Sequence, residues 1–103
     1  MTTPSEIAQS QATVVVPPSQ SMVSLLGSHD ELLRIVEREL PDAQILARGN
    51  EITARGSVED VGLFETLIAE MLTVLRTGQN LTPESVERSI ALVREGMHPA
   101  EVL

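Results

Sequence analysis

The stretch AQILARGNEITARG, residues 43–56, decides the fold. Its apolar and polar residues alternate on both sides of Gly49-Asn50, a pair that is typical of the two-residue turn of a β-hairpin. Such a turn sets the register of the two strands, so that one face of the hairpin is apolar and the other carries charge. The expected cross-strand pairs are Arg48 with Glu51, Ala47 with Ile52 and Ile45 with Ala54.

Helical patterns flank the hairpin on both sides. The helix before it is expected to end at Pro41, because proline cannot continue a helix. Ser57 is expected to open a long helix after it, and Thr82-Pro83 a last helix that Gly96 ends. The inward positions share helical spacing: Leu32, Leu33, Val36 and Leu40 in the first helix, Val61, Phe64, Ile68, Met71 and Leu75 in the second, and Val86, Ile90 and Val93 in the third.

The amino-terminal part divides into three short segments. Residues 1–12 are small, polar and without period, which is typical of a disordered tail. Residues 13–16 are all β-branched and are followed by Pro17-Pro18. This pattern favours a short edge strand, because proline cannot donate a hydrogen bond within a sheet. The apolar residues Met22, Val23, Leu25 and Leu26 follow the spacing of one helix face, which predicts a short helix there.

Gly27 falls between two expected helices. It stands where a left-handed helix C-cap is wanted, and Ser28 with Glu31 three residues later matches the capping box that begins a helix. Asp30 and Arg34 lie four residues apart in the order that supports a helix. We therefore interpret residues 27–30 as a tight turn with its own cap; the alternative is a phosphate-binding loop.

The order of elements predicts an α+β fold: a β-α-α-β-β-α sandwich, with a three-stranded sheet under helices, plus one appended C-terminal helix. The expected organisation is a tail over 1–12, a domain over 13–77, the appended helix over 78–96 and a linker over 97–103. The chain of 103 residues is too short for a two-lobed catalytic cleft, so we expect no enzyme activity from it.

Composition excludes several classes of function. The net charge is −8 and all seven cations are arginines, so the average field repels polyanions. With no cysteine and two distant histidines, His29 and His98, no metal site is expected. No apolar run is long enough to span a membrane and residues 1–12 lack a signal-peptide pattern, which indicates a cytoplasmic protein without a membrane partner.

Four stretches resemble the amino-terminal region of PhoH-like proteins, bacterial P-loop ATPases linked by name to phosphate starvation, and the last two resemble actinobacterial members most. They are LLGSHDELLRIVEREL, RGNEITARG, LFETLIAEMLTVLRTGQNLTPESV and HPAEVL. The resemblance implies that ATP and Mg²⁺ belong to a later domain, toward which residues 97–103 lead. The GxxxxGK(S/T) loop is absent here, as is any lysine, so no cofactor is expected in this part.

The same resemblance implies a KH-like fold, with which the element order agrees independently. KH domains bring a GxxG turn close to nucleic-acid phosphates, and the matching turn here reads Gly27-Ser28-His29-Asp30, with a carboxylate in place of the second glycine. Arg34 and Arg38 share a helix face, and a small basic strip would form if Arg48 or Arg55 lay nearby. The candidate RNA contacts are therefore Gly27, Ser28, His29, Arg34, Arg38, Arg48 and Gly49.

Each candidate also has a structural interpretation. Gly27 to Asp30 suits a capped turn, Arg48 and Gly49 suit a hairpin, and His29 suits a solvated turn. Two functions follow: a non-catalytic accessory domain that binds RNA weakly for a PhoH-like ATPase, or an assembly module. In the second, the apolar stripe of the 58–76 helix and the 83–95 helix pack against the ATPase domain of the same chain or against other subunits of a homo-oligomer.

Overall fold

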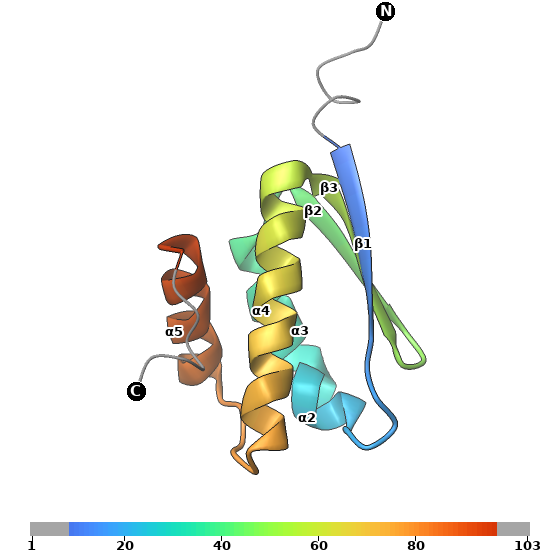
Figure 1. Ribbon diagram of the computed structural model, residues 1–103, viewed down its shortest axis with the longest axis vertical. Helices are drawn as coiled ribbons and strands as arrows, with labels where there is room; N and C mark the ends of the chain where they lie inside the picture. The colour runs from blue at the N-terminus through green and yellow to red at the C-terminus, as the bar shows by residue number, and fades with distance from the viewer. Residues whose placement is uncertain (1–8, 97–103) are drawn as a thin grey trace, which may run out of the picture.

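The computed structural model describes residues 9–96, and these form a three-stranded sheet with helices on one face (Figure 1). The expected linker 97–103 and His98 lie outside the described residues. The elements in chain order are β1 (Gln9–Val15), α2 (Met22–Leu26), the single 3-10 turn η1 (Ser28–Asp30), α3 (Glu31–Glu39), β2 (Ala43–Arg48), β3 (Glu51–Ser57), α4 (Val58–Arg76) and α5 (Pro83–Arg94). The predicted α+β class and element order are confirmed.

The hairpin forms in the predicted register. Arg48 lies opposite Glu51, Ala47 opposite Ile52 and Ile45 opposite Ala54. Gly49 adopts φ 58°, while Asn50 is not among the residues with positive φ, which matches the turn type that has glycine in its first central position. Asn50 also secures β1, because its carbonyl oxygen accepts a 2.7 Å hydrogen bond from the Val16 amide.

The sheet order is β1-β3-β2 and both pairings are antiparallel. The expected tail over residues 1–12 is wrong at its end, since β1 begins at Gln9 and pairs along β3 as far as Ser57. The first residues of β1 are small or polar and have low strand propensity, so the sequence pattern does not predict a strand there. The hydrogen bonds to β3 hold these residues in the sheet. Residues 1–8 lie outside the described part of the chain.

The helices bury one face of the sheet. Phe64, Ile52 and Ala54 are fully buried, so α4 packs directly onto the central strand β3. The predicted inward residues of α3 and α4 are buried, except that Leu75 is only half-buried. Val23 was expected on the inner face of α2 but is 66% exposed, because the helix has one turn and turns only Leu25 and Leu26 into the core.

The helix α5 is part of the same core and is not merely appended. It packs against α3 and α4, and its predicted inner residues Val86, Ile90 and Val93 are all buried. Two ion pairs fasten its outer side to α3: Arg38 with Glu87 at 3.2 Å and Arg94 with Glu39 at 3.3 Å. The apolar stripes of α4 and α5 are therefore used within the domain, which corrects the expectation that they face another protein.

The ends of the two long helices are capped as predicted. At the N-terminus of α4 the Ser57 hydroxyl accepts a hydrogen bond from the Asp60 amide at 3.1 Å, and at the N-terminus of α5 Thr82 and Ser85 form a reciprocal capping box that spans Pro83. None of the helices within residues 9–96 is long and apolar enough to cross a membrane.

Candidate nucleic-acid interface

The turn between α2 and α3 has an unusual backbone. Gly27, His29 and Asp30 all have positive φ, at 83°, 54° and 58°. His and Asp are among the few residues other than glycine that adopt this conformation, which is otherwise rare for L-amino acids. Asp30 therefore holds the backbone conformation of a glycine at the position where a GxxG turn has its second glycine.

Gly27 has two structural reasons to be glycine. Besides its positive φ, a Cβ at this position would lie 2.7 Å from Glu31 Cγ and 2.9 Å from Leu32 Cγ. Its amide donates a 2.7 Å hydrogen bond to the Val23 carbonyl, so it caps the C-terminus of α2 with the expected positive φ, but its ψ of 167° lies outside the left-handed helical region that was predicted. The turn is thereby held tightly against the first residues of α3.

The predicted capping box at Ser28 and Glu31 does not form. The N-cap residue of α3 is Asp30, and its side chain makes no capping hydrogen bond. Asp30 has a left-handed backbone, at φ 58° and ψ 29°, in place of the extended backbone that a capping residue normally has. The interpretation of residues 27–30 as a self-capped turn is thus right for Gly27 and wrong for the start of α3.

The structure does not bring the seven candidate residues into one site. A hollow of about 200 Å³ beside the turn is lined by Gly27 and Ser28, but its charged member is Glu31 rather than an arginine. The turn packs mainly against α2 and α3, whereas Arg48 and Gly49 lie at the tip of the β2–β3 hairpin (Figure 1). Arg48 lies opposite Glu51 there in the strand register, as the hairpin interpretation expects, although the two form none of the ion pairs between described residues.

The two arginines of α3 have different surroundings. Arg38 lies 3.2 Å from Glu87 and 3.5 Å from Glu39, so its charge is largely compensated. Arg34 is exposed and takes part in none of the ion pairs between described residues, including the one predicted with Asp30. Both arginines of α3 are exposed, but only Arg34 is free of ion pairs among the described residues.

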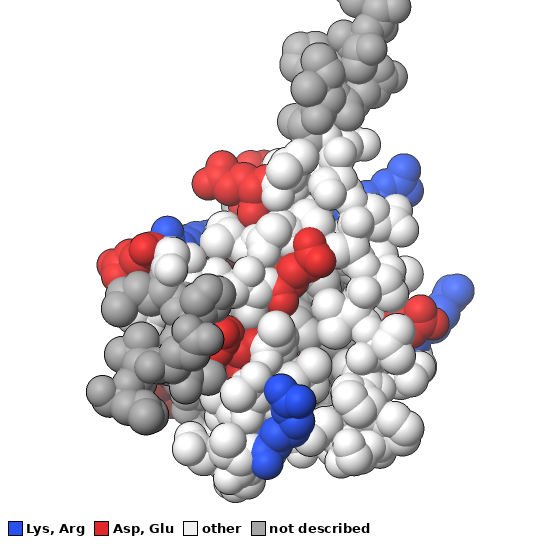
Figure 2. Space-filling view, viewed as in Figure 1, with Lys and Arg blue, Asp and Glu red and all other residues white. Residues whose placement is uncertain are grey.

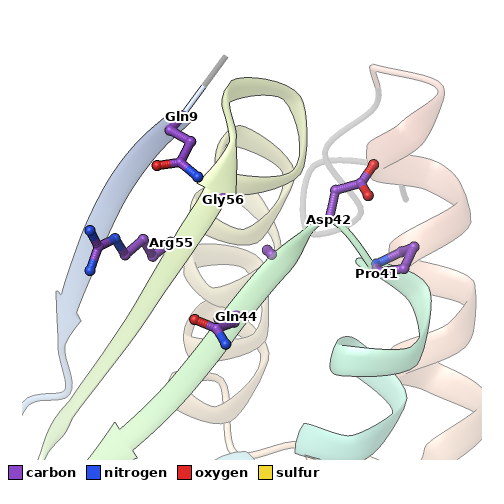
Figure 3. Close-up of a pocket in the computed structure, with 7 residues that line it drawn as sticks. Gln9, Pro41, Asp42, Gln44, Arg55 and Gly56 are labelled. Carbon is purple, nitrogen blue, oxygen red and sulfur yellow. The ribbon is translucent and has the colours of Figure 1, made fainter. Parts of the chain in front are cut away.

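A second hollow, of about 380 Å³, lies at the other end of the sheet and was not predicted (Figure 3). Arg55 and Gln44 project from adjacent strands at the same register position, and the Asp42 side chain points away from Arg55 in this view. The glycine in β3, Gly56, was the available signal, since a glycine inside a strand often marks a close backbone approach. Within residues 9–96 no group of three His, Asp or Glu side chains could hold a metal ion.

Charge is distributed unevenly over the molecule. Residues 7–28 contain no Asp, Glu, Lys or Arg, although 21% of the chain is charged. The described part of this segment forms β1, the connection and α2, and it includes Val15 and Val23, which are 60% and 66% exposed. Figure 2 shows the face that carries β1 and α4, which is mostly white but also carries several charged side chains of both signs. The charge-free segment from β1 to α2 is therefore the part of the chain suited to contact with an uncharged surface.

Known proteins give an independent comparison. No protein-family model matches the chain. PhoH-like proteins from Mycobacterium tuberculosis and Mycobacterium bovis are 47% identical to it over 98 residues, and one from Mycobacterium leprae is 44% identical over 95 residues. The matches cover 93% and 90% of this chain, which spans 27% of the length of each relative. The chain is therefore homologous to the N-terminal quarter of mycobacterial PhoH-like proteins.

Proposed function

We propose that this chain is a non-catalytic accessory domain of a PhoH-like, ATP-binding protein and that its role is protein–protein assembly. Its homology to one quarter of longer relatives supports the accessory role. ATP and Mg²⁺ would be bound elsewhere in such a protein, because this chain contains no lysine and no GxxxxGK(S/T) loop. The cytoplasm is the compartment in which we place it.

The observation that carries the assembly role is the uncharged side formed by β1 and α2. A chain of net charge −8 repels acidic partners over most of its surface, and a segment without charge avoids that repulsion. Interface centres are depleted in charged residues and accept exposed apolar side chains such as Val15 and Val23. The stripes of α4 and α5 cannot serve instead, because they are buried in the core.

The test is sedimentation velocity of the purified chain alone and mixed with the remaining three quarters of a mycobacterial PhoH-like protein. We expect self-association, a complex with that remainder, or both. A chain that stays monomeric and forms no complex would contradict the assembly role. Calorimetry with Mg-ATP tests the non-catalytic part, since saturable binding to this chain would overturn it.

Weak RNA binding at the turn is the second candidate function. The observation in its favour is that Gly27, His29 and Asp30 hold positive φ, the backbone freedom on which a GxxG turn depends. The element order also agrees with the KH-like fold that the resemblance implies. Against it stand the negative charges of Asp30, within the turn, and of Glu31, which lines the hollow beside the turn.

Asp30→Gly separates the two functions. It removes a carboxylate without changing the backbone that the turn requires, so an RNA-binding turn should gain affinity for a short single-stranded RNA at low ionic strength. Arg34→Gln is the matched control, because Arg34 is free of the ion pairs that occupy Arg38. RNA binding that rises in Asp30→Gly and falls again when Arg34→Gln is added would establish this second function. If neither the wild type nor Asp30→Gly binds RNA, this function is refuted.

A further inference from the structure

The outer edge of β1 carries backbone groups that no other described strand pairs with. The Val16 amide donates to Asn50, and these two residues extend the β1–β3 register by one pair. Bonded and non-bonded pairs alternate along an antiparallel ladder, so Val14, Ala12 and Ser10 also direct their backbone groups to β3. The residues whose N–H and C=O groups point away from β3 are therefore Gln9, Gln11, Thr13 and Val15.

This edge lacks the devices that usually prevent pairing between molecules. Edge strands are commonly protected by charged side chains, prolines or bulges. β1 has seven residues, none of them charged or proline, and it pairs along β3 without interruption. The other edge, β2, is shorter and carries Arg48, and the Ala43 amide at its start already bonds to the Leu40 carbonyl.

An apolar hollow continues the edge toward α4. It has a volume of about 230 Å³ and is lined by Val15, Pro17 and Gln20 from the β1 side and by Ala69, Leu72, Thr73 and Arg76 from α4. Gly62 lies on the same face of α4, two helical turns before Ala69, and a Cβ at this position would have no atom within 4 Å. A strand pair alone is smaller than the ~1,200 Å² of a stable interface, and this flank of α4 supplies additional contact area.

We propose that two copies of this chain pair edge to edge through β1, so that their sheets join into one continuous antiparallel sheet. This proposal rests on the assembly role above and names its partner. A second copy fits because the edge is self-complementary: a two-fold axis brings uncharged strand against uncharged strand. The charged residues opposite β1 on the neighbouring strand β3, Glu51 and Arg55, are of opposite sign and do not add a net repulsion there.

The backbone N–H and C=O groups that point away from β3 select one register for the two β1 strands. All of these groups form hydrogen bonds only if Gln11 lies opposite the partner's Thr13 and Gln9 opposite the partner's Val15. Ala12 then lies opposite its own copy in a non-bonded pair. The Cα atoms of such a pair are about 4.5 Å apart, within the range of about 4.4–6.8 Å that disulfides span.

Ala12→Cys therefore tests the register in a protein that has no cysteine of its own. We expect rapid disulfide dimers under mild oxidation. The matched control is Ala47→Cys, since Ala47 is likewise a half-buried alanine on an edge strand, but on β2. Cross-linking of Ala12→Cys at least about tenfold faster than that of Ala47→Cys supports the proposal, and equal or absent cross-linking overturns it.

Sedimentation equilibrium of the full chain tests the same contact without cysteine. Gln11→Glu should raise the dimer dissociation constant at least about tenfold, because it sets two carboxylates near the axis. Gln11→Glu/Thr13→Lys should restore the dimer, since opposite charges then face each other. Gln44→Glu, an equally exposed change on β2, should have no such effect.

The outcomes separate this proposal from the assembly role. A chain that is monomeric alone but binds the remainder of a PhoH-like protein overturns the β1 pairing and leaves the assembly role standing. A dimer that Gln11→Glu does not weaken overturns the β1 pairing as well.

The dimer dissociation constant should also fall as the ionic strength rises, because salt screens the repulsion between two acidic copies.

Discussion

Gly56 and Asp42 approach each other so closely that a Cβ on Gly56 would stand 1.9 Å from the Asp42 carbonyl oxygen. The same carbonyl accepts a 2.9 Å hydrogen bond from the Ser57 amide, and the Asp42 amide donates to Asp60 Oδ2 at 2.9 Å. The start of β2, the end of β3 and the first turn of α4 are thus joined at one point. Any side chain at position 56 would force these three elements apart.

Gly56→Ala should destabilise the fold by about 2–4 kcal/mol, because the backbone must shift to admit the methyl group. Gly62→Ala is the control within the same domain. It adds the same methyl group to an exposed helix position with nothing within 4 Å, and should stabilise by about 0.5–1 kcal/mol. Urea denaturation measures both, and a Gly56→Ala variant as stable as the wild type would contradict the close approach.

Asp30→Gly should leave the stability unchanged or raise it by up to about 1 kcal/mol. The capping pattern in the sequence predicts a loss, but the Asp30 side chain makes no capping bond and its φ of 58° suits glycine better. Ser28→Ala should be nearly neutral for the same reason. A drop in melting temperature for Asp30→Gly would restore the capping interpretation.

The docking of α5 should depend on its apolar face rather than on its ion pairs. Ile90→Ala should cost about 2–4 kcal/mol, because it leaves a cavity against α3 and α4. Glu87→Gln should change the stability by less than about 0.5 kcal/mol, since both partners of its ion pair are more than half exposed. Similar losses for the two variants, measured by thermal unfolding, would argue against this division.

Gly49→Val should destabilise the hairpin by about 1–3 kcal/mol, because valine tolerates positive φ badly. Asn50→Gly should cost less. It keeps the Asn50 carbonyl that binds the Val16 amide and loses only the longer bond, 3.4 Å, from the side chain to the Val16 carbonyl. Equal melting temperatures would show that the turn conformation is misassigned.

Much of the candidate site could not be foreseen from spacing. Arg34 and Arg38 look alike in sequence, yet α5 brings Glu87 to Arg38 and leaves Arg34 without an ion pair among the described residues. Ser28, Glu31 and Asp30 match a capping pattern, but the positive φ values at residues 29 and 30 remove the geometry that capping requires. Each of these differences arises from a contact or a backbone constraint that lies outside the local pattern.

The sequence by itself determined the local structure: the hairpin register around Gly49-Asn50, the caps at Ser57 and Thr82, and the buried stripes of α3, α4 and α5. These depend on neighbours within a few residues, where turn geometry and helical period act directly. Only the tertiary structure decided that β1 begins at Gln9 and pairs with β3, and that α5 completes the core. Those features depend on which distant segments supply hydrogen bonds and apolar contacts, and a local pattern does not specify its remote partner.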